Sequence, residues 1–372
     1  MTDSKPLDIA VLPGDGIGEE VTHAAMPIFQ ELGLPITFSY GDIGWACWER
    51  AGNAFPDQSL ELVTRSDATL LGAITSKPQR EAIKALPKAM QANPPTYLSP
   101  LLKLRQQFDM YANVRPCYAI QSDSKHFNFC IIRENTEGLY SGLDYAPLPQ
   151  SFNPILNDVP RWKDMPLDEL AGSIRLQSSS GLTRIFKYAF QYAEANGFAR
   201  VTFADKPNVL RHSSAFARDL FESVAKDYPN IEADIHNVDA VALWMVRRPE
   251  QFGVIVAENM FGDILSDVGA AVMGGLGLAL SANIGDHACY FEPVHGSGPA
   301  IKKGQANPGA MFLTIALMLQ HVGFSEQAFR VRQAVELVVS KAEVVTYDLG
   351  GKSSTQSMAD AIIDAYIIGN GL

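Results

Sequence analysis

Short apolar segments alternate with amphipathic segments along most of this chain, and this alternation constrains the fold more than any other feature. Buried strands are predicted at 9–12, 68–73, 129–133, 201–204 and 253–257, and helices at 19–32, 101–108, 179–196, 260–269 and 358–368. Strands that alternate with helices are typical of an α/β fold with much parallel sheet. At 372 residues, two domains are expected. Because no linker separates them, we expect a boundary within one continuous sheet.

Residues 144–168 depart from this pattern. They contain five prolines and show no helical periodicity. A long irregular stretch within a compact protein is usually a functional loop or an interaction arm.

Charge and cysteine content narrow the class of protein. The net charge is −11 and no basic run stands out, so nucleic-acid binding is not expected. The four cysteines lie far apart, which favours a reducing compartment over disulfides or a zinc site. No signal peptide is recognisable, and the most apolar stretch, 268–284, is too short and glycine-rich to cross a membrane. We therefore expect a cytoplasmic protein without a membrane partner.

Two aspartates in the segment GDILSD indicate a metal site. Asp263 and Asp267 are four residues apart in a predicted helix, so their carboxylates share one face. A divalent cation with oxygen ligands would relieve their repulsion. The alternative is a solvated acidic face, but the apolar residues around them favour a buried, occupied site.

Three arginines follow or end apolar elements. Arg105, Arg115 and Arg133 lie in LLKLR, ANVRP and FCIIR. A buried arginine is costly unless it meets an anion, and bidentate binding of a carboxylate is the usual reason for it. Each could be a structural ion pair, but three together favour a polycarboxylate substrate.

Other candidates are weaker when taken alone. Lys206 follows a buried strand and Tyr140 lies in a glycine-rich loop, where they could move protons, although an exposed lysine and a packed tyrosine are equally simple interpretations. His295, in a loop rich in Gly and Pro, could face a ribose or phosphate, and Asn307 an adenine. The segment GDGIG at 14–18 does not match GxGxxG and could be only a tight turn.

Together these motifs resemble those of the β-decarboxylating dehydrogenases, which include isocitrate, isopropylmalate, homoisocitrate and tartrate dehydrogenases. LPGDGIG, YANVRP, IRENTEGLYSG, DKPNVL, ENMFGDILSD, NIGD, EPVHGSGPA and ANP occur in the family order over essentially the whole chain. The resemblance implies a two-domain α/β fold that is not a Rossmann fold, with the active site in a cleft between the domains. One domain would comprise 1–110 and 274–372 and the other 111–273, with 144–168 as a dimerisation arm.

The resemblance also implies a role for each matched residue. Tyr140 and Lys206 would be catalytic, as acid and base. The substrate would be bound by Ser99, Leu101, Arg105, Arg115 and Arg133, and Mg²⁺ or Mn²⁺ by Asp239, Asp263 and Asp267. The nicotinamide cofactor would be bound by Ile17, Asn208, Asn259, Glu292, His295, Gly296, Ser297, Ala300 and Asn307. Lys206 and Asp239 would serve the active site of the neighbouring subunit, which implies a homodimer with shared sites.

The implied reaction is the metal-dependent oxidative decarboxylation of a 3-substituted (R)-malate. Leu98 stands where homoisocitrate enzymes favour Arg and isopropylmalate enzymes Glu, and Leu101, Leu102 and Val209 could form an apolar pocket that would leave a third carboxylate unpaired. This favours an isopropylmalate-like substrate, whereas RENTEGLYSG favours the isocitrate and homoisocitrate branch; a tartrate or malate type is a further alternative.

The cofactor is NAD or NADP. Members that use NAD carry Asp where this chain has Ala300; the lack of this acid, together with Lys302, Lys303 and Tyr347, makes NADP possible. Gly351 stands where NADP-dependent isocitrate enzymes carry an arginine that binds the phosphate, and the lack of this arginine favours NAD. Two further hypotheses stay open: a catalytically silent regulatory subunit, and a metal-independent Rossmann hydroxyacid dehydrogenase.

Overall fold

A large mixed sheet forms the centre of the protein. The computed structural model describes residues 6–120 and 126–369. In this part of the chain, a ten-stranded sheet has the order β2-β1-β3-β12-β11-β4-β5-β10-β8-β9. The strands are β1 (Leu7–Gly14), β2 (Ile36–Tyr40), β3 (Ala68–Ala73), β4 (Ala112–Tyr118), β5 (Asn128–Glu134), β8 (Arg200–Asp205), β9 (Glu232–Asn237), β10 (Val254–Ala257), β11 (Leu280–Ile284) and β12 (Cys289–Pro293).

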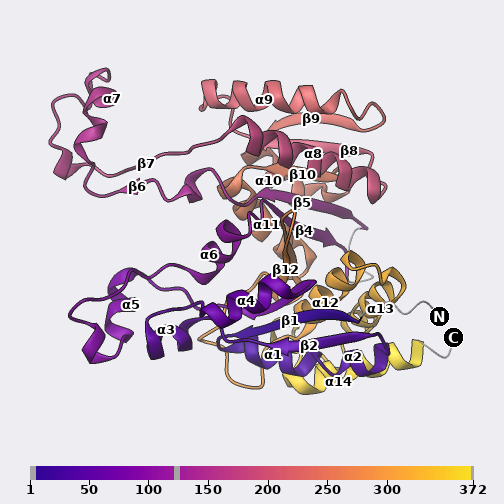
Figure 1. Cartoon of the computed structure of the whole chain (residues 1–372). Helices are drawn as coiled ribbons and strands as arrows, with labels where there is room; N and C mark the ends of the chain where they lie inside the picture. The colour runs from indigo at the N-terminus through magenta and orange to yellow at the C-terminus, as the bar shows by residue number, and fades with distance from the viewer. Residues whose placement is uncertain (1–5, 121–125, 370–372) are drawn as a thin grey trace.

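Helices pack on both faces of this sheet (Figure 1). They are α1 (Ile17–Ala25), α2 (Ile28–Leu32), α3 (Trp45–Ala51), α4 (Asp57–Arg65), α5 (Gln79–Ala85), α6 (Pro100–Gln107), α8 (Ser179–Ala195), α9 (Arg211–Ala225), α10 (Val238–Arg247), α11 (Asn259–Met273), α12 (Gly309–His321), α13 (Ser325–Lys341) and α14 (Thr355–Gly369). The predicted α/β class is confirmed.

The two outer parts of the sheet are parallel and its centre is antiparallel. β2, β1, β3 and β12 run parallel, as do β5, β10, β8 and β9. Between them, β12–β11, β11–β4 and β4–β5 pair antiparallel. The sheet is therefore continuous, as expected, whereas the domain boundary itself stays a prediction.

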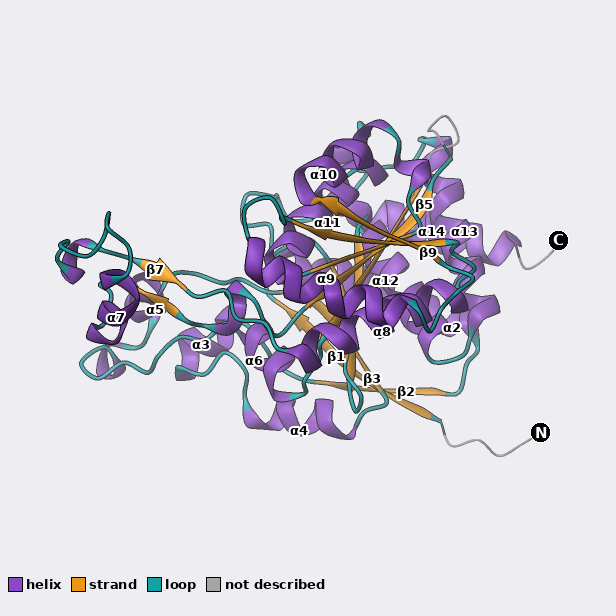
Figure 2. Ribbon diagram, turned by 90° about the horizontal axis from the view of Figure 1, so that it is seen from above, coloured by secondary structure: helices purple, strands orange, loops and turns teal. Residues whose placement is uncertain are grey.

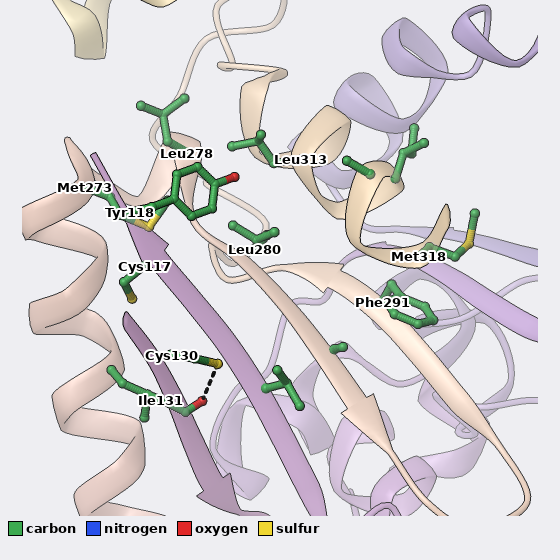
Figure 3. Close-up of a cluster of buried hydrophobic side chains, with 14 of the residues drawn as sticks. Cys117, Tyr118, Cys130, Ile131, Met273, Leu278, Leu280, Phe291, Leu313 and Met318 are labelled. Carbon is green, nitrogen blue, oxygen red and sulfur yellow. Dashed lines mark hydrogen bonds between the residues drawn. The ribbon is translucent and has the colours of Figure 1, made fainter. Parts of the chain in front are cut away.

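Side-chain alternation along the central strands separates two faces of the sheet. Arg133 and Ile131 of β5 meet α11, because Gly262 and Gly269 of that helix lie against them. Cys130 points the other way and meets Tyr192 of α8. On this second face, α12 covers β11; Figure 3 shows Tyr118, Leu280 and Leu313 in the buried core there.

The proline-rich segment forms an arm that projects from the body. β6 (Asp144–Tyr145) and β7 (Gly172–Ser173) pair as a short antiparallel ribbon at its base. Both views show the arm on the side of the molecule away from α13 (Figures 1 and 2). The prediction that it lacks helix was wrong for α7 (Asn153–Asn157), whose proline occupies the second helical position, where its missing N–H costs nothing.

One predicted helix is broken in two. The prediction of a single helix over 19–32 was wrong, because α1 ends at Ala25 and α2 begins at Ile28. Pro27 lies at the break and has no N–H to continue the hydrogen-bond ladder. In the described part of the chain, no helix is long and apolar enough to cross a membrane.

Candidate active site

The three predicted arginines converge on the face of the sheet that α11 covers. Arg105 is on α6, Arg115 on β4 and Arg133 on β5, and all three are buried. Burial lowers the pKa of Arg133, and the charges of Arg105 and Arg115 lower it further, which places the guanidinium groups within electrostatic reach of one another. Three buried cations in one region need anionic partners.

Arg105 is bound on both sides by residues of β12. Its Nε donates to the hydroxyl of Tyr290 at 2.7 Å and its Nη2 to Oε1 of Glu292 at 3.1 Å. Burial alone would lower the pKa of Arg105, but Tyr290 and Glu292 raise it above its ordinary value. Arg105 is therefore a permanent cation with one buried countercharge.

Arg115 and Arg133 are oriented by amides and by Asp263. Nε of Arg115 donates to Oδ1 of Asn113 at 2.6 Å, and its Nη2 lies 3.5 Å from Oδ1 of Asp263. Nε and Nη2 of Arg133 donate to Oδ1 of Asn259 at 3.0 and 2.8 Å, and its Nη1 forms an ion pair with Asp263. The geometry thus shows that two guanidinium groups share one carboxylate.

Tyr140 completes this cluster. It lies in the short 3-10 turn Leu139–Ser141, and its hydroxyl donates to Oδ2 of Asp263 at 2.7 Å. The guanidinium of Arg133 lies 5.1 Å from the centre of its ring. Burial raises the pKa of Tyr140, and the hydrogen bond to Asp263 raises it further. The phenol therefore keeps its proton at neutral pH, as a general acid must.

Asp263 and Asp267 share one face of α11, as predicted. Burial raises the pKa of Asp263, but Arg133, Tyr140 and Arg115 outweigh it, so the net shift is downward. The pKa of Asp267 is raised, first by burial and then by Asp263, although Arg115 opposes this. The side chain of Asp267 is 66% exposed. The donors are carboxylate oxygens that repel each other, which fits a divalent cation such as Mg²⁺ or Mn²⁺.

The third predicted metal ligand lies elsewhere in the chain. Asp239, in the first turn of α10, forms an ion pair with Lys206, and its side chain is 67% exposed. Among the described residues, no group of three or more histidine, cysteine or acidic side chains is close enough to hold a metal ion. A site with Asp239, Asp263 and Asp267 is therefore not formed within one chain, because Asp239 follows β9 at the edge of the sheet.

A second part of the site is a glycine-rich cavity of about 320 Å³. Ile17, His295, Gly296 and Asn307, all predicted to bind the cofactor, line it together with Tyr347 and Asp348. Burial lowers the pKa of His295, whose ring is neutral and whose Nδ1 donates to the carbonyl of Gly296 at 3.0 Å. Nε2 of His295 is buried without a hydrogen-bond partner, so it can accept from a ligand.

The remaining predicted cofactor residues do not all face this cavity. Glu292 binds Arg105 and accepts from Asn283 at 3.1 Å, and its charge also acts on His295, so it lies between the two parts of the site. Ser297 accepts from the hydroxyl of Thr75 at 2.6 Å. Asn259 holds Arg133, and Asn208 and Ala300 are exposed.

Ser99 and Leu101, two further residues predicted to bind the substrate, lie at the start of α6. Ser99 is the N-cap residue without a side-chain hydrogen bond to the helix, and it accepts from the hydroxyl of Ser76 at 3.3 Å. Leu101 is partly buried against a small core cluster, whereas Leu98 and Val209 are 64% and 65% exposed. That Leu101 and Val209 help to form an apolar substrate pocket stays a prediction.

Sequence reasoning missed the residues that orient the arginines. Asn113, Asn283 and Ser281 form a buried hydrogen-bonded network across β4 and β11, with Nδ2 of Asn113 donating to both other side chains at 2.8 Å. Ser266 accepts from Arg115. A signal existed in the sequence: Asn113 lies two residues before Arg115, so both side chains point to the same face of a strand.

Comparison with known proteins agrees with this geometry. Residues 8–362 match the family model described as "Isocitrate/isopropylmalate dehydrogenase". The chain belongs to this family. It is 39% identical to the 3-isopropylmalate dehydrogenase of Methanothermobacter thermautotrophicus, with 96% of this chain and 98% of that protein covered. The crystal structure of isocitrate dehydrogenase from Methylococcus capsulatus is similar, with a TM-score of 0.84, 35% identity, and 97% and 99% of the two chains covered.

A further relative is longer than this chain. The chain is 57% identical to protein DlpA of Legionella pneumophila over 98% of its own length, but it spans only 59% of that protein. Family membership confirms the predicted fold, an isocitrate/isopropylmalate dehydrogenase fold rather than a Rossmann fold. It also places the chain among the decarboxylating dehydrogenases that act on hydroxy acids.

Proposed function

We propose that this protein catalyses the metal-dependent oxidative decarboxylation of a 3-substituted (R)-malate. The hydroxyl at C2 is oxidised to a ketone, and the carboxyl group on C3 then leaves as CO₂. The observation that carries the proposal is the cluster in which Arg115, Arg133 and Tyr140 all reach Asp263. It combines cations for a dicarboxylate, a protonated acid and an oxygen ligand for a metal in one place.

Each part of this cluster has a task. Arg105, Arg115 and Arg133 bind and orient the substrate carboxylates, and fixed orientation alone can supply several kcal/mol of rate enhancement. Tyr140 returns a proton to C3 after CO₂ has left. Lys206 takes the proton of the C2 hydroxyl. When bound, a divalent cation held by Asp263 and Asp267 would stabilise negative charge on the C2 oxygen, and NAD or NADP would accept the hydride.

The substrate proposal is an alkyl-malate similar to 3-isopropylmalate. Leu98 and Val209 are large, apolar and exposed, so they can cover an alkyl group. A third substrate carboxylate placed against these apolar side chains would stay unpaired, at a cost of several kcal/mol. Isocitrate and homoisocitrate are the alternatives, which the motif RENTEGLYSG favours.

The nicotinamide cofactor is proposed to bind in the glycine-rich cavity, with its adenosine part near His295 and Asn307. Ala300 carries no charge that would repel a 2′-phosphate, whereas Gly351 supplies no cation to attract one. NAD and NADP therefore both stay candidate cofactors. The four free cysteines are buried, which supports a cytoplasmic location, where thiols stay reduced.

A homodimer with shared active sites is part of the proposal. Lys206 and Asp239 are partly or largely exposed and pair with each other, and among the described residues Asp239 does not join Asp263 and Asp267 in one cluster. Helix α10, which carries Asp239, also exposes Leu243, Trp244 and Val246, an apolar surface suited to a second copy of this chain. Each protomer would then lend its Lys206 and Asp239 to the partner's site.

The test is a substrate panel on the purified protein. Isopropylmalate, isocitrate, homoisocitrate, tartrate and malate are each assayed with NAD and NADP, in the presence of Mg²⁺ or Mn²⁺. We expect the highest kcat/KM with an alkyl-malate and loss of activity with EDTA. If the cofactor is reduced only with isocitrate or homoisocitrate, the substrate is one of these tricarboxylates and not an alkyl-malate. Full activity with EDTA would contradict the proposed metal dependence. If no combination reduces the cofactor, the result would support a catalytically silent subunit.

A further inference from the structure

The root of the arm carries a buried arginine that no part of the proposed reaction uses. Arg175 follows β7, and its side chain is only 12% exposed. It lies between two acids, Asp205 and Glu258, whose side chains are each 1% exposed. A guanidinium between two buried carboxylates is expensive to build unless its geometry is needed.

The first acid connects Arg175 to the catalytic lysine. Nη2 of Arg175 donates to Oδ1 of Asp205 at 3.2 Å. Asp205 is the last residue of β8, and Lys206 follows it directly. Nη1 of Arg175 also meets Oγ of Ser213, in the helix after this loop, at 3.5 Å. Arg175 therefore holds both ends of the loop that presents Lys206.

The second acid connects Arg175 to the helix with the proposed metal ligands. Nε of Arg175 lies 3.6 Å from Oε2 of Glu258, and its guanidinium lies 5.3 Å from the ring centre of Phe261. Glu258 is the N-cap of α11, because its carboxylate accepts from the backbone N–H of Phe261 at 3.2 Å. Asn259, which orients Arg133, is the next residue.

Backbone pairing extends the same connection to Tyr140. Leu176, directly after Arg175, pairs with Gly138, whose N–H donates to the carbonyl of Leu176 at 2.8 Å. Gly138 has φ +77°, and a Cβ there would lie 2.5 Å from Oε2 of Glu258, so only glycine allows this approach. Tyr140 follows two residues later.

Charge explains why an arginine is needed. Burial raises the pKa of Glu258, and Arg175 is the main group that opposes this. Oε2 of Glu258 has no hydrogen-bond partner, so its ion pair with Arg175 is what opposes its charge there. A lysine would bring one point charge, whereas a planar guanidinium can reach two carboxylates in different directions.

We infer that Arg175 is the positioning residue through which the root of the arm holds Lys206 and the start of α11 in register. This inference rests on the proposed function, which makes Lys206 a catalytic base and gives α11 the metal ligands. If Lys206 serves the partner's site, Arg175 connects a protomer's own site to the residue that it lends. Arg175 touches no reacting group, and it acts through Asp205 and Glu258.

Chemical rescue tests this inference. Arg175→Ala leaves a cavity between Asp205, Glu258 and Phe261 into which free guanidinium fits. We expect kcat to fall about 100-fold, since small misplacements of catalytic groups cost that much. Millimolar guanidinium chloride restores kcat, whereas urea, which has a similar shape without the charge, does not. Arg175→Lys is expected to fold and to recover only part of the activity.

The matched control is Arg200→Ala, because Arg200 bridges Glu232 and Asp234 at the opposite end of β8.

Hydrogen exchange separates this inference from the proposed reaction. In Arg175→Ala, the amides of Leu210, which bonds to Lys206, and of Phe261, which bonds to Glu258, exchange faster, and guanidinium slows both. This readout holds even if the substrate panel shows no activity. Wild-type kcat in Arg175→Ala, or faster exchange at only one of the two amides, would overturn the inference. The inference would also be overturned if guanidinium and urea had the same effect on the lowered kcat of Arg175→Ala and Arg175→Lys, because the charge of Arg175 would then not matter.

Discussion

Asp263 is the residue on which the site depends, because Arg115, Arg133 and Tyr140 all direct their polar groups at it. Its two carboxylate oxygens are divided between them: Oδ1 faces the arginines and Oδ2 the phenol. A change in any of these side chains therefore alters the charge balance of the other three. Predictions at the residue scale follow from this division.

Tyr140→Phe is expected to lower kcat about 100-fold, the ordinary contribution of a general acid. KM for the substrate should change little, because the arginines that bind it are kept. Steady-state kinetics that follow both cofactor reduction and release of the keto acid measure this effect. Tyr145→Phe, a change on the arm, is the control. An unchanged kcat in Tyr140→Phe would remove the phenol from the mechanism.

His295 makes folding stability depend on pH in a defined window. Burial lowers its pKa in the folded state, whereas in the unfolded chain it takes up a proton near pH 6.5. Above about pH 6.5 both states are neutral, and below it the unfolded state binds the proton first, so the free energy of unfolding falls as the pH decreases. Urea denaturation at pH 5.5 and 7.5 should show a smaller decrease in His295→Gln than in the wild type. The exposed His236→Gln serves as control.

Part of this site could be predicted from the sequence. Arg105, Arg115 and Arg133 each end an apolar element, and Asp263 and Asp267 share a helical spacing, so their residue types and positions indicate an anion site and a metal site. Arg175 could not be found in this way. Its partners Asp205 and Glu258 are distant in sequence, and only the folded sheet brings the ends of β8 and β10 together.

At the scale of elements, local signals predicted most strands and helices but not their order. The buried run Ala68–Ala73 is a strand over the predicted residues. The antiparallel centre of the sheet was not predicted, because the pairing of β11 with β4 joins segments more than 160 residues apart. The short helix α7 was missed because five residues are too few to show a periodicity.

The arm provides a test at this scale. Tyr145 and Gly172 are paired residues of β6 and β7, so a two-residue Asn-Gly turn can replace 146–171. Because the arm contributes little to the main core, we expect the shortened protein to stay folded, with a circular dichroism spectrum close to that of the wild type. The proposed dimer should weaken, and sedimentation and activity should report a monomer with low kcat.

A second variant checks whether the arm acts through its apolar surface. Ile155, Val159 and Met165 are exposed, and their exchange for serine keeps the length of the arm. We expect the same loss of dimer as in the deletion. A shortened protein that stays dimeric and active would show that the arm has another role.

At the scale of the whole molecule, the proposal that Lys206 serves the partner's site predicts complementation. Lys206→Ala and Asp263→Asn homodimers should each be inactive. When the two are unfolded, mixed in equal amounts and refolded, half of the dimers contain both chains, and one of their two sites is intact. About a quarter of the wild-type activity should return, as expected for a twofold-symmetric assembly.

The control is a mixture of Tyr140→Phe with Asp263→Asn. Both residues belong to the same cluster within one chain, so each of the two sites in a mixed dimer lacks one of them. If this mixture recovers as much activity as the first, exchange of subunits alone would not explain the recovery. Absence of recovery in the first mixture, with refolding verified, would place Lys206 in its own protomer's site.

The ion pair between Arg133 and Asp263 has a thermodynamic consequence. A carboxylate of the protein occupies the guanidinium that an anionic substrate would need, so binding is an exchange of one carboxylate for another. A cation that draws Asp263 toward itself releases Arg133, and a substrate that takes Arg133 releases Asp263. Linkage is reciprocal, so each ligand raises the affinity for the other by the same factor. If the proposed metal ion and substrate bind here, this single contact between two side chains would make their binding cooperative.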